Sequence, residues 1–190
     1  LSFDNTTATT PSRYTNWETV ELNNGSVLTL GGDFKLGDSD SHTGTFSINS
    51  ASTLVVNQGS ISAFTAGQRV TVNNNSLIDM TTGSSVATDV LPIHGNYTAN
   101  NGQLALQSVL AGDNSPSDKL VVSQGTISGS TVIIMSNLGG PGGQTVQHGI
   151  QVVQAINGAT GTDLAVSLPG RSVSAGAVGY YPHQGGVPPG

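Results

Sequence analysis

Short apolar runs separated by turns constrain this chain most, and they are clearest between residues 95 and 158. The runs cover residues 104–106, 120–122, 132–135 and 150–153, with clusters of Gly, Asn, Ser and Pro between them. They are too short for helices and rich in β-branched residues, which is typical of buried strands. The pattern predicts an all-β chain in which this segment is the stable end of an elongated structure.

The same alternation extends upstream to Trp17, and three architectures fit it: a β-sandwich, an antiparallel barrel and a β-solenoid. The hairpin-like pairs Asn24-Gly25 and Asn101-Gly102 keep the first two open. Recurrent Asn-rich turns favour the solenoid, because stacked coils would let their amides hydrogen-bond along the stack; these turns cover residues 23–25, 57–59, 73–75 and 100–102. A coil of roughly 20 residues predicts about five coils before the end segment.

The composition excludes several partners. Charged residues make up 8% of the chain, against roughly 25% in an average soluble domain, so Gly, Ser, Thr and Asn dominate its surface. Nucleic acids and anionic membranes need clustered positive charge, whereas the net charge here is −6 and the five basic residues are scattered: Arg13, Lys35, Arg69, Lys119 and Arg171. The absence of Cys excludes disulfides, thiolate metal sites and Cys nucleophiles.

Several blocks in the second half of the chain resemble a known family. They are Gly95-Asn96-Tyr97-Thr98 and residues 104–106, 117–122, 125–129, 149–153 and 174–177. In this order they are similar to the C-terminal autochaperone, or junction, region of type V autotransporter passengers of the pertactin-like and AIDA-like kind. After residue 177 the family tends to continue with an apolar strand, whereas this chain runs into Pro182.

The resemblance implies a right-handed parallel β-helix with a C-terminal capping β-structure. It also implies secretion by a Gram-negative bacterium through the periplasm to the cell surface. The partner it implies is the protein's own C-terminal outer-membrane β-barrel, which this chain lacks. The abrupt start at Leu1 leads us to expect a fragment of a longer passenger.

We expect three segments along the chain. Residues 1–94 would form β-helix coils of the passenger stalk, residues 95–181 the autochaperone-like terminal coils and cap, and residues 182–190 an exit linker. The exposed sheet edge at the end of a solenoid needs a cap. Proline cannot donate a ladder hydrogen bond, so Pro182, Pro188 and Pro189 suit a linker beyond it.

We expect no catalytic, cofactor-binding or metal-binding residues. The densest polar cluster is Asp33, Asp38, Asp40 and His42, whose spacing fits neither an EF-hand nor the glycine-rich calcium nonapeptide, so a solvated loop is favoured. The other acidic neighbours are Glu18 with Glu21 and Asp113 with Asp118, and residues 113–118 are interpreted as a plain turn. The histidines His94, His148 and His183 are isolated.

The sequence therefore favours a structural role over an enzyme. The main hypothesis is a C-terminal stalk that acts as folding nucleus, or autochaperone, for β-helix assembly and outer-membrane translocation, in support of an adhesin or virulence function. Leu120 and Ile150 are expected to matter more for folding than positions near Val27. The alternative is that the β-helix itself adheres to a host receptor or to another copy. A polysaccharide-cleaving β-helix, which needs paired carboxylates on one face, is the least favoured.

Overall fold

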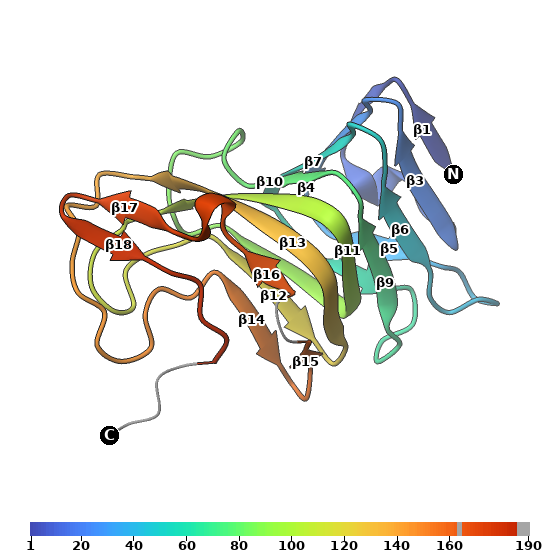
Figure 1. The fold of residues 1–190 in the computed structure, drawn as a ribbon. Helices are drawn as coiled ribbons and strands as arrows, with labels where there is room; N and C mark the ends of the chain where they lie inside the picture. Colours follow the sequence, from blue (N-terminus) through green and yellow to red (C-terminus); the bar gives the residue numbers. More distant parts are fainter. Residues whose placement is uncertain (163–164, 186–190) are drawn as a thin grey trace.

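The computed structural model describes residues 1–162 and 165–185 as a parallel β-solenoid with a small antiparallel sheet near the C-terminus (Figure 1). Two short 3₁₀ helices accompany the strands: η1 (Pro11–Arg13) and η2 (Pro169–Arg171). The strands are β1 (Ser2–Asp4), β2 (Thr7–Thr9), β3 (Thr19–Asn23), β4 (Val27–Gly31), β5 (Phe34–Leu36), β6 (Thr45–Ile48), β7 (Thr53–Gln58), β8 (Ile61–Ala63), β9 (Val70–Asn74), β10 (Leu77–Asp79), β11 (Val90–Ser108), β12 (Lys119–Ser123), β13 (Thr126–Asn137), β14 (Val153–Ile156), β15 (Thr160–Gly161), β16 (Val166–Ser167), β17 (Val173–Ala175) and β18 (Val178–Tyr180).

The strands stack into three faces, and neighbours on each face run parallel. One face joins β1, β3, β6, β9, the middle of β11 and the start of β13. A second joins β2, β4, β7, β10 and the later parts of β11 and β13. The third joins β5, β8, the start of β11, β12 and β14. This parallel pairing confirms the solenoid and excludes the sandwich and the antiparallel barrel.

The coils are longer than the predicted length of roughly 20 residues. Thr19 pairs with Thr45 and Thr45 with Thr71, and cross-coil hydrogen bonds in this part of the chain span 26 residues. Each coil must supply three strands and the turns that join them, which explains the extra length. The whole solenoid has about four turns, so the prediction of about five coils before the end segment was too high.

Rows of apolar side chains fill the interior. Val20, Phe46, Val72 and Tyr97 share one row in register and are 0% exposed. Leu28, Leu54, Ile78 and Leu104 form another such row on the second face, also 0% exposed. Alternate residues of a strand face opposite sides, so each coil presents the same inward positions again. The core is therefore a narrow, mostly aliphatic column.

An asparagine ladder runs along one corner, as predicted, but with a different member. The Asn49 side-chain amide donates to Asn23 Oδ1 at 3.1 Å, and that of Asn75 donates to Asn49 Oδ1 at 2.8 Å. The predicted turn at residues 57–59 lies at another corner. Asn49 escaped notice because its turn lacks glycine; Ala51 there adopts a φ of 59°.

The end segment needs one correction. The predicted runs 104–106, 120–122 and 132–135 lie in β11, β12 and β13. The run 150–153 is not a buried strand: β14 begins only at Val153, and Ile150 is half-buried in a loop. Val146, Gln147 and Gly149 donate backbone hydrogen bonds to the Asp113 carboxylate. These bonds hold the residues before Ile150 in a loop.

The C-terminal residues of the described chain form a hairpin. β17 and β18 pair antiparallel, so the stretch before Pro182 does contain a strand, which ends at Tyr180. The hairpin lies beside the long loops at one end of the molecule, away from β1 (Figure 1). The expected exit linker, residues 182–190, falls partly outside the described residues, which end at 185.

Candidate functional site

β11 is the central strand of the solenoid. Its 19 residues cross all three faces, pairing with β8, β9 and β10 on one side and with β12 and β13 on the other. It turns its first corner at Gly95, where φ is 153° and an added Cβ would lie 2.1 Å from the Val70 carbonyl oxygen. Gly125 stacks above, and its Cβ would lie 1.8 Å from the Gly95 oxygen. Only glycine lets these coils approach so closely.

One buried carboxylate joins the two ends of this coil. Asp118 is 0% exposed; its Oδ1 accepts a hydrogen bond from the Asp89 N–H at 2.9 Å and its Oδ2 accepts one from the Gln107 N–H at 2.7 Å. Asp89 immediately precedes β11, and Gln107 lies near its end. The Asp118 N–H donates in turn to the Gln107 carbonyl at 2.9 Å. We call Asp89, Gln107 and Asp118 the coil clasp, because together they close β11 into a ring and fix the start of β12.

The clasp holds a carboxylate in a poorly solvated place. Burial raises the pKa of Asp118 above its ordinary value, the two N–H donors act in the opposite direction, and the nearby Asp89 charge raises it further. Two oxygen atoms close to these groups, Asp89 Oδ2 and Gln107 Oε1, are buried without a hydrogen-bond partner. The coil clasp is therefore a structural contact, and its contribution to stability depends on whether the Asp118 carboxylate is protonated.

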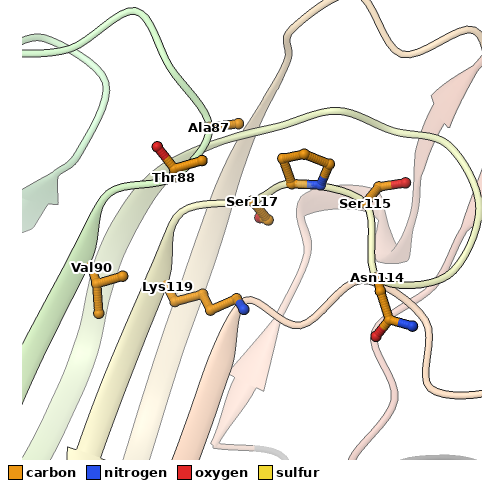
Figure 2. Close-up of a pocket in the computed structure, with 8 residues that line it drawn as sticks. Ala87, Thr88, Val90, Asn114, Ser115, Ser117 and Lys119 are labelled. Atoms are coloured by element: carbon orange, nitrogen blue, oxygen red, sulfur yellow. The ribbon is translucent and has the colours of Figure 1, made fainter.

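A shallow hollow of about 270 Å³ is lined by the residues on either side of Asp89 and Asp118 in the sequence, Thr88, Val90, Ser117 and Lys119 (Figure 2). Val90 and Thr88 line one side, and Asn114 and Ser115 face them from the loop before β12. Lys119 extends across the opening and is the one titratable residue among those that line it. The lining of the hollow thus combines one ammonium with hydroxyls and small apolar groups, without the acid–base pair that general acid–base catalysis uses.

The two carboxylates of the predicted acidic pair, Asp113 and Asp118, do not act together but accept hydrogen bonds from different parts of the chain. The Asp113 carboxylate accepts from the N–H groups of Val146, Gln147 and Gly149 at 2.7, 3.0 and 2.6 Å. These bonds, led by that from Val146, lower its pKa. Segment 113–118 is thus a turn, but one that ties a neighbouring loop and carries the clasp. An Asp two residues before the buried run 120–122 was the sequence signal for the clasp, and the turn interpretation overlooked it.

The hairpin is tied to the same loops by Tyr180. Its hydroxyl donates to the carbonyl oxygen of Ala111 at 2.9 Å and accepts from the Gly143 N–H at 2.8 Å. No sequence pattern predicts this contact, since its partners lie 69 and 37 residues away. Together with Asp113, Tyr180 holds the long loops of the terminal coils against the hairpin.

The predicted polar cluster is a locally bonded loop. Asp38 Oδ1 accepts from the Asp40 N–H and from both the N–H and the hydroxyl of Ser41, and these bonds lower the pKa of Asp38 to about 2. Asp33 instead accepts from Ser60 on the next coil. The isolated histidines His94, His148 and His183 are exposed.

Metal-binding geometry is missing from the part of the chain that the structure describes. Within residues 1–162 and 165–185, no three His, Asp or Glu side chains gather to hold a metal ion. Among the same residues, no helix is long and apolar enough to span a membrane.

A stack of parallel strands on three faces, followed by a short antiparallel hairpin, places this chain in the class of parallel β-helical proteins. The family Autochaperone Domain Type 1 matches residues 68–181, more than half of the chain. The chain belongs to this family and so forms the autochaperone region of an autotransporter passenger, as the resemblance predicted. In autotransporters as a family, the passenger is accompanied by a cognate β-barrel translocator domain and is secreted to the cell surface.

Two of the three relatives described next are named as autotransporters. The chain is 40% identical over 92 residues to the uncharacterized protein YdeU of Escherichia coli K12, covering 48% of this chain and 19% of that protein. It is 38% identical over 101 residues to the adhesin BmaC autotransporter of Brucella suis, covering 51% of this chain and 3% of the adhesin. It is 40% identical over 89 residues to the probable autotransporter YfaL of E. coli K12, covering 44% of this chain and 7% of that protein. The chain therefore spans a small part of each of these relatives.

Proposed function

We propose that this chain is the C-terminal stalk of a surface-displayed passenger and acts as the folding nucleus for β-helix assembly and outer-membrane translocation. The observation that carries the proposal is the coil clasp, which closes β11 through Asp118. In a solenoid each coil is the template for its neighbour. A coil that is already closed offers a preformed edge on both sides, to β8–β10 and to β12–β13.

The proposed segments follow from this role. Residues 95–181 are the autochaperone-like coils and cap, residues 1–94 are stalk coils, and residues 182–190 lead onward to the translocator. We propose a non-catalytic role, which is supported by the hydrogen bonds that occupy the carboxylates of Asp38, Asp113 and Asp118.

Surface display of paired variants tests the nucleus. Leu120 in β12 and Leu28 in β4 are both 0% exposed leucines in parallel strands, so Leu120→Ala and Leu28→Ala remove the same group from matched sites. In the full-length passenger, display measured by antibody on intact cells should fall more for Leu120→Ala. Equal losses would overturn the nucleus and leave only general destabilisation. Val27, the upstream position chosen from the sequence, is a poorer control because it is half-buried.

An adhesive surface is the second candidate. Thr19, Thr45 and Thr71 align in register in one uncharged row, and the row beside it runs from Glu21 to Ser47 and Asn73, with Glu21 as its charged member. Faces of an acidic protein that carry so few charges repel one another little, and a relative is named an adhesin. Aggregation of cells that display this chain would indicate self-association, and binding to host cells without aggregation a receptor. If the cells show neither aggregation nor binding to host cells, the chain is excluded as the adhesive surface.

A further inference from the structure

A second hollow, of about 260 Å³, lies beside β5 in the upstream coils. In Figure 1, β5 is at the opposite end of the molecule from β17 and β18. The lining residues of the hollow are Pro11, Ser12, Tyr14, Thr15, Asp33 and Lys35. They come from η1 and the turn after it, and from β5 with the residue before it. The autochaperone family match begins at residue 68, so this hollow lies outside the matched region.

The aromatic wall of the hollow is held in place. Tyr14 is half-buried, and its ring meets that of Phe3 edge to face, with 4.9 Å between centroids and 86° between planes. Its N–H donates to the Pro11 carbonyl at 2.9 Å, which closes the turn after η1. The ring therefore has a fixed orientation next to the buried ring of Pro11. Such a wall offers a flat apolar surface on which the C–H groups of a ligand can pack.

The polar side of the hollow is also ordered. Asp33 and Lys35 flank the buried Phe34, so alternation along the strand places both on the outer side. Asp33 Oδ1 accepts from the N–H of Ser60 at 3.0 Å and from its hydroxyl at 2.9 Å. These bonds fix the carboxylate, while its Oδ2 takes part in neither of them. One carboxylate oxygen and one ammonium thus lie beside an aromatic wall.

We infer that this hollow binds a neutral pyranose sugar. A pyranose ring has an apolar C–H face, which suits Tyr14 and Pro11, and hydroxyl groups on its edge. Those hydroxyls can donate to Asp33 Oδ2 and accept from Lys35 Nζ, in charge-assisted hydrogen bonds. The volume is below the range of about 300–1,000 Å³ that drug-sized ligands occupy, so the hollow suits a single ring. An acidic sugar fits less well, because its carboxylate would lie near Asp33.

A shallow site for one ring binds weakly, and dense display on a surface compensates for this. Many copies of a weak site engage a repeating glycan together, which raises the effective affinity without new contacts. The site is independent of the folding role, since it shares no residue with the coil clasp.

The test is a titration of the whole chain with methyl glycosides of neutral hexoses and, separately, with a methyl glucuronide, followed by amide chemical shifts. Neutral glycosides should shift the signals of residues 11–15 and 33–35. Asp33→Asn retains an acceptor for Ser60 and should weaken binding about tenfold or more, through loss of the charged acceptor. Lys35→Met keeps the aliphatic stem and should also weaken it.

Tyr14→Ala should abolish binding, with Trp17→Ala as its control. Trp17 is 43% exposed and does not line the hollow, so its loss should leave the titration unchanged. If the Tyr14→Ala chain fails to fold because the contact with Phe3 is lost, the Asp33→Asn and Lys35→Met variants still test whether the hollow binds the sugar. The inference is overturned if no neutral glycoside shifts these signals, if only the glucuronide binds, or if Asp33→Asn binds as well as the parent chain.

Discussion

The coil built by β11 and the last coil, built by β14, β15 and β16, belong to the same stack but differ in how they are held. Leu91, Ile93 and Tyr97 of β11 are 0% exposed, and a buried carboxylate ties the ends of the strand. In β14, by contrast, every residue is half-buried or exposed, and β15 and β16 have two residues each. Among described strands, β14 pairs only with β12. The stable part of the terminal region therefore lies inside the stack and not at its end.

This difference places the expected folding nucleus around β11 and β12 and not in the last coil. The sequence pattern treats Leu120 and Ile150 as equivalent, whereas the structure buries Leu120 completely and leaves Ile150 half-buried in a loop. A terminal coil has a neighbour on one side only, so it gains less from stacking. Variants in the two coils should therefore behave differently.

The largest effect is expected from Leu120→Ala. Truncating a fully buried leucine removes its transfer free energy and leaves a cavity, so the free energy of unfolding should fall by ~2–5 kcal/mol. Urea unfolding followed by circular dichroism measures it. Leu28→Ala should cost a similar amount but mainly speed unfolding, whereas Leu120→Ala should slow refolding. Equal refolding rates for the two variants would contradict a nucleus in the β11–β13 region.

Asp118→Ala should have the second-largest effect and lower the free energy of unfolding by about 2 kcal/mol. It leaves the buried N–H group of Gln107 and the partly buried N–H group of Asp89 without an acceptor, at up to ~1–3 kcal/mol each, while removal of a buried charge offsets part of that cost. Hydrogen exchange should show faster exchange of these two amides and of β12. Asp113→Ala is the matched control, because its carboxylate also accepts backbone N–H bonds but lies in an exposed loop. If the β12 amides exchanged just as fast in Asp113→Ala as in Asp118→Ala, the clasp would stabilise β12 no more than the hydrogen bonds of an exposed loop do.

Ile150→Ala should cost about 1 kcal/mol or less, because a half-buried side chain loses little apolar contact. The same urea titration measures it beside Leu120→Ala. A loss as large as that of Leu120→Ala would show that the last coil is packed as firmly as the closed one, and the comparison of the two coils would fail.

Much of the fold could be predicted from the sequence, and the limits have physical causes. Apolar runs at 104–106, 120–122 and 132–135 marked strands because inward positions repeat locally. The coil length was underestimated because it depends on how three faces close, and Asn49 was missed because a turn without glycine can still adopt positive φ. The clasp joins residues 11 and 29 apart in sequence, and such distant pairs leave no periodic signal. Ile150 was misassigned because backbone N–H groups of its loop donate hydrogen bonds to the distant Asp113 carboxylate, and these bonds decide the path of the loop.

The smallest effect is a pH dependence of opposite sign at two aspartates. The fold raises the pKa of Asp118, chiefly through burial. The contribution of Asp118 to stability is therefore fully present below its unfolded pKa, near 3.8, and is lost as the pH rises through the folded value. For Asp79, burial raises the pKa, but the hydroxyl and N–H groups of Thr82 and Thr81 outweigh it, so the net pKa is lowered. Its contribution is present above 3.8 and is lost as the pH falls through the folded value.

Asp118→Asn and Asp79→Asn separate the two contributions, because neither amide titrates. The stability of the parent chain relative to Asp118→Asn should decrease from acid to neutral pH, whereas its stability relative to Asp79→Asn should increase over the same range. Urea unfolding between about pH 3 and pH 7 measures both differences. A parallel pH dependence of the two differences would show that the Asp118 carboxylate is hydrated rather than enclosed. The clasp would then close the β11 coil no more tightly than an ordinary surface turn.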